Sequence, residues 1–446
     1  MAGGTFKLSQ PKTRPGTYVN LKNGRARRIA ASERGVATIP LIGYDYGPRG
    51  EFLKLTNESP DAFIAQFGRS VNSDNSFMLM LRLMLSNATT VYAYIPDGGT
   101  KATKQVNLSD GVNVTFTAMY NGTRGNKIKI ASVANPVSGF DVSVYMDGEE
   151  VELFEGITTV QSLVGLSSYV TVSGTGAMAA FASVSLEGGT DTVTGNSGIS
   201  DYLDKCEKIR FNCMAFPTED TSLRAALLAK IKYLRETVGW KCQAVAPNFP
   251  ADYEGIINLT NSFAIDDTEL TTAQACAWMA GATAGADYTT SLTYATVVGA
   301  TKVIGELTNE GAIAAIKAGK TFFSVSENDI VILEYDINSL VTFPEDKPAD
   351  MNKNRPVRVY DSWCNDCMTI FVPGRYDNSE DGWTVIEGIG RALLQMYAND
   401  GAITNVDLEN DFLVDTERSI GDSLYIDAGL QAVDSADKYY ITTIAR

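Results

Sequence analysis

Histidine, the most versatile catalytic side chain, is absent from all 446 residues of this chain. Nucleophile systems of the Ser-His-Asp or Cys-His type need an imidazole base. Zinc, haem and non-haem iron sites commonly take imidazole as a ligand. The sequence therefore excludes histidine-dependent catalysis and histidine-ligated metals, and it leaves mainly carboxylate and lysine chemistry.

Carboxylates are abundant in the last quarter of the chain, at Asp361, Asp366, Asp377, Glu380 and Asp381. Two such groups on either side of a glycosidic bond can act as general acid and base. Their spacing selects no pair, and acidic loops are usually solvated. A carboxylate-based envelope-glycan hydrolase is therefore kept as the alternative function.

Two short motifs resemble binding sites. Cys364-Asn-Asp-Cys367 has the spacing of a redox pair or half a zinc site, but no second C-x-x-C is present. Ala318-Gly-Lys-Thr321 resembles the end of a phosphate-binding loop. However, Ala314 occupies the place of the first glycine, and the segment runs from helix to strand. We therefore expect structural roles for both motifs, and no cofactor or metal.

The elements around these residues change in style along the chain. Residues 29–100 and 190–335 alternate strand and helix patterns, as expected of a sheet covered by helices. Residues 101–189 are rich in Thr, Ser, Val and Gly with period-two alternation, and Gly-Gly pairs bound them. Residues 336–435 contain a long amphipathic helix, Trp383–Ala398. We expect an α/β (α+β) multidomain fold with mixed sheets and an inserted β-rich domain.

Both ends of the chain read as single extended strands. Residues 1–28 form an arm with the short strand pattern Thr17–Leu21, and residues 436–446 contain Lys438–Ile444 with alternating polar and apolar positions. A lone terminal strand must pair elsewhere or stay disordered. Strand addition to the sheet of a neighbouring copy would satisfy both ends.

The charge distribution supports contact between copies. The net charge is −16, which argues against nucleic-acid binding. Residues 1–34 nevertheless carry eight basic side chains and one acid, whereas residues 400–446 carry ten acids and three bases. Opposite potentials steer association and fix its register. No apolar run reaches the ~20 residues of a membrane helix. The N-terminus lacks the apolar core of a signal peptide, so we expect folding in a cytoplasm.

Several soft motifs occur together in a recognisable order. They are Met1-Ala-Gly-Gly-Thr5, Arg14-Pro-Gly-Thr-Tyr-Val-Asn20, Leu186-Glu-Gly-Gly-Thr-Asp191, Asn309–Lys320 and the closing strand. With these motifs the chain resembles the contractile tail sheath proteins of myophages, R-type bacteriocins and defective prophages of Gram-positive bacteria. The resemblance covers most of the chain.

The resemblance implies a structural role and no catalysis. Subunits would stack as six-fold rings in a helical tube around an inner tail tube, and contraction would drive the tube through an envelope. No nucleotide is needed, because the extended state is metastable and stores the energy. Implied partners are the chain itself, the inner tube protein, and baseplate and tail terminator proteins. The expected location is a virion tail or bacteriocin particle assembled in the host bacterial cytoplasm.

The resemblance also implies roles for particular residues. Residues 101–189 would face outward, and the C-terminal domain would face the tube. The further alternative function, a surface-layer or adhesion protein built on residues 101–189, would require secretion of the chain. The donated strands are Tyr18, Val19 and Leu21 in the N-terminal arm and Tyr440, Ile441 and Ile444 at the C-terminus; the intersubunit charges are Arg25, Arg27 and Arg28 with Asp407, Asp411 and Asp415; the tube-facing helix presents Ile386, Arg391 and Gln395.

Overall fold

The computed structural model describes residues 3–4, 17–18, 34–56, 63–108, 111–193, 197–343, 345, 347 and 349–445. The chain forms two units, residues 1–31 and residues 32–446. In the first unit, strand β1 (Gly3–Gly4) pairs in parallel with β2 (Thr17–Tyr18). The elements described below belong to the second unit.

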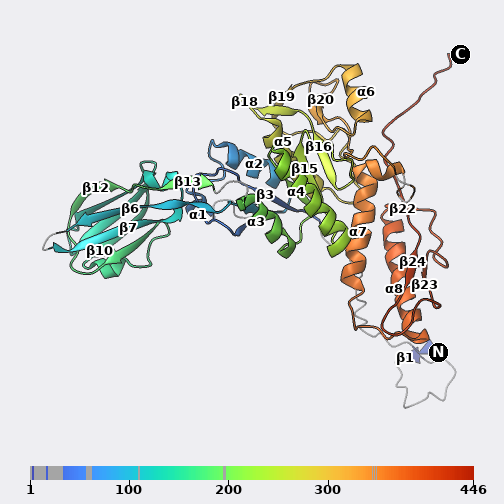
Figure 1. Cartoon of the computed structure of the whole chain (residues 1–446), viewed down its shortest axis with the longest axis horizontal. Coiled ribbons are helices and arrows are strands. Elements are labelled where there is room, and N and C mark those ends of the chain that lie inside the picture. Colours follow the sequence, from blue (N-terminus) through green and yellow to red (C-terminus); the bar gives the residue numbers. More distant parts are fainter. Residues whose placement is uncertain are drawn as a thin grey trace. The chain divides into compact units, whose positions relative to one another are not determined.

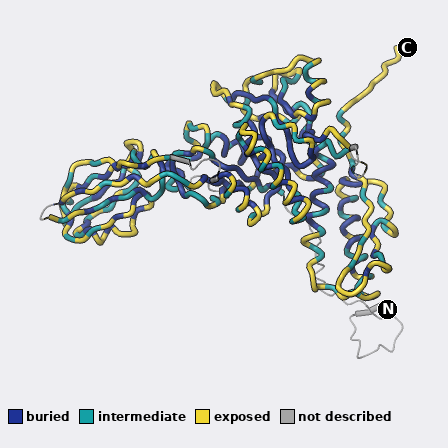
Figure 2. Tube along the Cα trace, in the orientation of Figure 1, coloured by how far each residue is buried: buried dark blue, intermediate teal, exposed yellow. Residues whose placement is uncertain are grey.

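A six-stranded sheet lies at the centre of the second unit. Its strand order is β16-β15-β14-β3-β5-β4, parallel except for β4, which runs antiparallel to β5. Its central strands are almost wholly buried, as Figure 2 shows in dark blue, because helices cover both faces. The strands are β3 (Val36–Pro40), β4 (Phe52–Thr56), β5 (Thr90–Tyr94), β14 (Cys213–Ala215), β15 (Gln243–Pro247) and β16 (Ile256–Leu259).

Two pairs of helices enclose this sheet. Helices α2 (Ser76–Leu85) and α5 (Thr272–Gly285) share one hydrophobic core with it, and α3 (Ser197–Lys205) and α4 (Thr221–Lys232) share the other. The small residues of α5 allow close packing: a Cβ at Gly281 would lie 2.6 Å from a backbone oxygen of α2. A short helix, α1 (Ile64–Phe67), precedes α2.

Eight strands form a β-sandwich inserted between β5 and β14 (Figure 1). One sheet has the order β10-β9-β8-β12, and the other has β11-β7-β6-β13. The alternating patterns expected from sequence become β7, β8 and β9, with apolar side chains pointing inward. The strands are β6 (Gly98–Asn107), β7 (Asn113–Asn121), β8 (Ile128–Ala134), β9 (Phe140–Met146), β10 (Glu149–Ile157), β11 (Val170–Gly174), β12 (Phe181–Ser185) and β13 (Thr190–Val193).

The rest of the unit consists of smaller sheets and two long helices, α7 and α8. Helix α6 (Asn309–Lys317) ends just before Gly319, whose φ of 63° lies in the left-handed region. The smaller strands are β17 (Ser262–Ile265), β18 (Thr268–Glu269), β19 (Ala300–Ile304), β20 (Phe323–Val325), β21 (Val331–Leu333), β22 (Ile403–Thr404), β23 (Phe412–Val414), β24 (Ile426–Ala428) and β25 (Gln431–Ala432). The long helices are α7 (Asn354–Ile370) and α8 (Glu380–Asn399).

The expected α+β multidomain class with mixed sheets and an inserted β-rich part is confirmed. After α4 the backbone continues as a π-helical turn, η6 (Tyr233–Val238). Residues 433–445 form no ladder in the isolated chain, and the pairing of 438–444 with another copy stays a prediction. Helix α7 was not expected at all, because its buried stripe is polar.

Candidate assembly site

The C-terminal segment, residues 438–445, has no regular secondary structure and extends into solvent (Figure 2). Its apolar side chains are far more exposed than such residues usually are in a folded protein. Tyr440 is 91% exposed, Ile441 85% and Ile444 80%. The three residues predicted to form the donated C-terminal strand therefore lie free on the surface of the described chain, with their backbone groups available for pairing.

The N-terminal arm is described only in part. Tyr18 lies in β2, which pairs with β1. Val19, Leu21, Arg25, Arg27 and Arg28 lie outside the described residues. Where the chain enters the second unit, Arg34 donates hydrogen bonds to the carbonyl oxygens of Thr283 and Ala286.

The predicted acidic partners lie after α8. They differ in how much of their negative charge is compensated by groups within the chain. The exposed Asp407 accepts hydrogen bonds from Glu409 N and Asn410 Nδ2, and these bonds lower the pKa of its carboxyl group. Asp411 accepts from the backbone of Asp407. Asp415 is bound by Arg418 at 2.5 Å, so much of its charge is compensated within the chain.

Helix α8 presents two of its three predicted tube-facing residues. Arg391, paired with Glu387 at 3.0 Å, is partly exposed, and Gln395 is exposed. Ile386 is only 4% exposed, so its expected place on a contact surface is wrong. The reason is that the helix buries this side chain against the loop and strands that follow α7 and α8.

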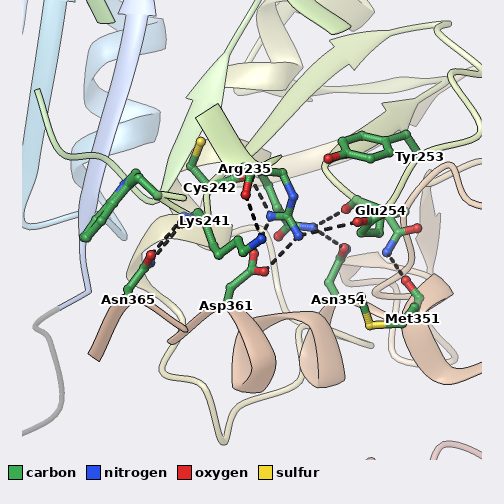
Figure 3. A network of polar contacts seen from close by, with 12 residues as sticks. Arg235, Lys241, Cys242, Tyr253, Glu254, Met351, Asn354, Asp361 and Asn365 are labelled. Atoms are coloured by element: carbon green, nitrogen blue, oxygen red, sulfur yellow. Dashed lines mark hydrogen bonds and ion pairs between the residues drawn. The ribbon is translucent and has the colours of Figure 1, made fainter. Parts of the chain in front are cut away.

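Helix α7 packs through a buried polar stripe on the central unit, which is the part of the second unit around the six-stranded sheet (Figure 3). Asp361 binds Arg235 in a bidentate pair, with N–O distances of 2.6 and 2.8 Å. The π-helical turn η6 brings Arg235 inward beside Leu234. Burial lowers the pKa of the Arg235 guanidinium, but the Asp361 carboxylate, with smaller contributions from Tyr253 and Glu254, more than offsets this effect, so the pKa is raised and the guanidinium stays charged.

Further bonds extend this polar junction along α7. The Asn365 amide accepts from Lys241 N and donates to Lys241 O, both at 2.9 Å, as a neighbouring strand would. Gln243 Nε2 donates to Asn354 Oδ1 at 3.0 Å. Arg358, almost wholly buried, binds Asp336 at 2.6 Å. Two buried ion pairs and several amide bonds thus fix α7 on the central unit.

Sequence reasoning missed this junction, although a signal was present. Positions 354, 358, 361 and 365 follow the i, i+4, i+7, i+11 spacing of one helix face, but they are occupied by Asn, Arg, Asp and Asn. Apolar periodicity is the usual guide to a buried face, and here that face is polar. Pro356, which is tolerated in a first helical turn, would have marked the start.

The residues considered for catalysis have structural partners instead. Asp361 pairs with Arg235, and Asp366 accepts a hydrogen bond from Tyr397 Oη at 2.7 Å. Asp377, Glu380 and Asp381 are exposed around the start of α8, whereas Asp361 and Asp366 are buried in α7. No group of potential ligands within the described residues could hold a metal ion.

The Cys364–Cys367 pair lies within α7 rather than in a loop. Burial raises the pKa of both thiols, that of Cys367 to about 12, so they are protonated and weakly nucleophilic at neutral pH. In the described part of the chain, no helix combines the length and apolar character needed to cross a bilayer.

Comparison with known proteins accounts for most of this architecture. Residues 97–191 match the phage tail sheath protein beta-sandwich domain, residues 192–339 the phage tail sheath protein central domain, and residues 346–446 the phage tail sheath C-terminal domain. The phage-like element PBSX protein XkdK of Bacillus subtilis is 33% identical over 99% of both chains.

Solved structures show the same likeness. The sheath tail protein of Desulfitobacterium hafniense is 34% identical, with a TM-score of 0.83 over 96% of this chain and 99% of that one. The contracted helical sheath of the anti-feeding prophage is 11% identical, with a TM-score of 0.57 over 97% of this chain and 99% of that one, and shares the fold. The chain therefore belongs to the phage tail sheath protein family, and it is a structural subunit rather than an enzyme.

Proposed function

We propose that this chain polymerises as stacked six-fold rings into a helical sheath around an inner tail tube, and that contraction of the sheath drives this tube through a target cell envelope. The observation that carries the proposal is the exposed, unpaired C-terminal segment. Exposed apolar surface of this kind is uncommon in a protein that functions as a monomer, and it usually marks a contact with another molecule.

Strand exchange is the proposed joint between subunits. The C-terminal segment of one copy and the N-terminal arm of another would each add a strand to small sheets of a third copy. The pairs β22–β25 and β23–β24 are two-stranded, so each has open edges in the isolated chain. Main-chain hydrogen bonds would supply the joint. Burial of Ile441 and Ile444 would add about 1.5–3 kcal/mol for each side chain.

Charge would fix the register of this joint. Arg25, Arg27 and Arg28 of one copy would approach Asp407 and Asp411 of another. Among the described residues neither acid forms an ion pair, whereas Asp415 pairs with Arg418. A head-to-tail contact of this kind is heterologous and generates rings or helical filaments. It also remains linked while the subunits move, since each strand is held by its own ladder.

The remaining surfaces are assigned by position. The N-terminal arm (1–28) and C-terminal strand (436–446) link subunits, while residues 29–100 and 190–335 form the core. The sandwich (101–189) would face outward. The C-terminal domain (336–435) would face the inner tube through Arg391 and Gln395 of α8. Baseplate and terminator proteins would close the ends of the sheath, in a virion tail or bacteriocin particle assembled in the bacterial cytoplasm.

Negative-stain electron microscopy of the concentrated full-length chain tests this proposal. We expect hollow tubes with regular cross-striation. Chains lacking residues 1–28 or 436–446 should fold but form no tubes. Dispersed single chains at every salt and protein concentration would reject the proposal.

A matched pair of variants separates the joint from general surface effects. Replacing Tyr440 and Ile441 with Ser removes apolar surface from the proposed strand. Val137→Ser removes a residue of equal exposure, 91%, from the sandwich. Tube formation should be lost in the first variant and kept in the second. Equal loss in both would argue against strand donation.

A further inference from the structure

The C-terminal segment leaves the folded unit at a defined point. Strand β25 pairs with β22, and Val433 N donates the last backbone bond of this pairing to Ala402 O, at 2.8 Å. From Lys438 onward every described residue is exposed, whereas β25 ends at Ala432. The five residues between, 433–437, are the root of the segment, and whatever holds the root sets the direction in which the segment extends.

Lys353 holds the root. Its ammonium group binds Asp434 at 2.5 Å and also binds Asp437. The two carboxylates lie three residues apart and share one nitrogen, and Ser435 Oγ donates a 2.7 Å hydrogen bond to Asp437, the second of them. The Lys353 side chain is 13% exposed and that of Asp437 9%, so water screens this pair only weakly.

Lys353 is itself rigidly placed. It forms an antiparallel bridge with Ile337, and its ammonium lies 5.4 Å from the centre of the Tyr335 ring. The next residue, Asn354, begins α7 and donates to Asp336 Oδ1 at 2.9 Å within the polar junction. The root is therefore tied to the central unit through a short chain of buried contacts, and not through its own backbone alone.

We propose that Lys353 is the positioning residue that fixes where and in which direction the C-terminal segment leaves the subunit, and that the sheath lattice depends on this clamp. The inference rests on the strand donation proposed above. Residues 438–445 extend about 26 Å at about 3.3 Å per residue. A tilt of about 20° at the root would displace the tip by about 9 Å, roughly twice the ~4.8 Å spacing between strands. A loose root would therefore miss the acceptor edge.

Hydrogen exchange on the full-length chain, read before assembly, tests the clamp directly. Lys353→Met should accelerate exchange of the Val433 amide, which is bonded to Ala402 O, at least tenfold. Lys353→Arg should restore protection, because a guanidinium can also bind both carboxylates. Lys302→Met, which removes an exposed pair with Glu269, is the control and should change nothing in this segment. Equal exchange at the root in wild type and Lys353→Met would overturn the clamp.

Electron microscopy of the same variants tests the consequence for assembly. Lys353→Met should reduce ordered tubes at least tenfold, and Lys353→Arg should restore them. The triple variant Lys353→Met/Asp434→Asn/Asp437→Asn leaves no unpaired charge, so it separates a positioning role from lost stability; it should also lack ordered tubes. Tubes of wild-type rise and twist from the triple variant would overturn the inference while leaving the sheath proposal intact. Absence of tubes in the wild type, with exchange still dependent on Lys353, would reject the sheath proposal alone.

Discussion

Arg235 and Asp361 lie at the centre of the polar junction, and their environment determines the cost of separating them. Both side chains are buried, at 3% and 7% exposure. A buried pair contributes little beyond its own desolvation, whereas removal of one partner leaves an uncompensated charge. Arg235 also donates to Cys242 O at 2.8 Å and lies 3.7 Å from Glu254, so its position is set from several sides.

We expect Asp361→Leu to lower the free energy of unfolding by about 3–5 kcal/mol, because the Arg235 cation remains buried without its main partner. Urea denaturation measures this change. In the double variant Arg235→Met/Asp361→Leu the cation left without its main partner is removed as well, so more than half of the loss should be recovered. A double variant as unstable as Asp361→Leu would contradict this account of the junction.

At the scale of elements, helix α8 packs closely on strand β23. A Cβ at Gly390 would lie 2.2 Å from the ring of Phe412, which is itself buried and stacks on Phe371 at 5.8 Å. The lack of a side chain at Gly390 therefore allows this close packing. At Gly388 nothing lies within 4 Å of the added atom.

Gly390→Ala should therefore destabilise the chain by about 1–3 kcal/mol through overpacking, partly offset by the better helix propensity of alanine. Gly388→Ala is the matched control in the same helix. It should stabilise the chain by about 0.5–1 kcal/mol, since it gains propensity without a clash. Thermal or urea unfolding of both variants checks the pair, and equal effects would contradict the packing described here.

At the scale of the whole molecule, the opposite charges of the two chain ends predict salt-sensitive assembly. The screening length falls from about 10 Å at 0.1 M salt to about 3 Å at 1 M. The rate of tube formation, followed by light scattering, should therefore fall severalfold over this range.

Variants locate the charges responsible for this sensitivity. Asp407→Asn with Asp411→Asn keeps acceptor atoms for the local turn, but should weaken the salt dependence. Glu149→Gln with Glu150→Gln removes the same charge from exposed positions on the sandwich and should leave it unchanged. An identical response in both pairs would indicate an effect of net charge alone.

Local patterns in the sequence were sufficient for much of this protein. Period-two alternation indicated the sandwich strands, and the helix-to-strand pattern around Ala318–Thr321 agrees with the end of α6 and the start of β20. The two lone terminal strand patterns and their opposite charges pointed to assembly, since these features are carried by neighbouring residues alone. The absence of histidine excluded whole classes of catalysis for the same reason.

Only the tertiary structure decided which distant segments meet. The polar face of α7 is buried because Arg235, Lys241 and Gln243, more than a hundred residues earlier, provide its partners. Ile386 is buried because the segments around it close over α8. Lys353 holds Asp434 and Asp437 across some eighty residues of chain. Local periodicity reports which face of an element differs from the others, whereas burial depends on what packs against that face.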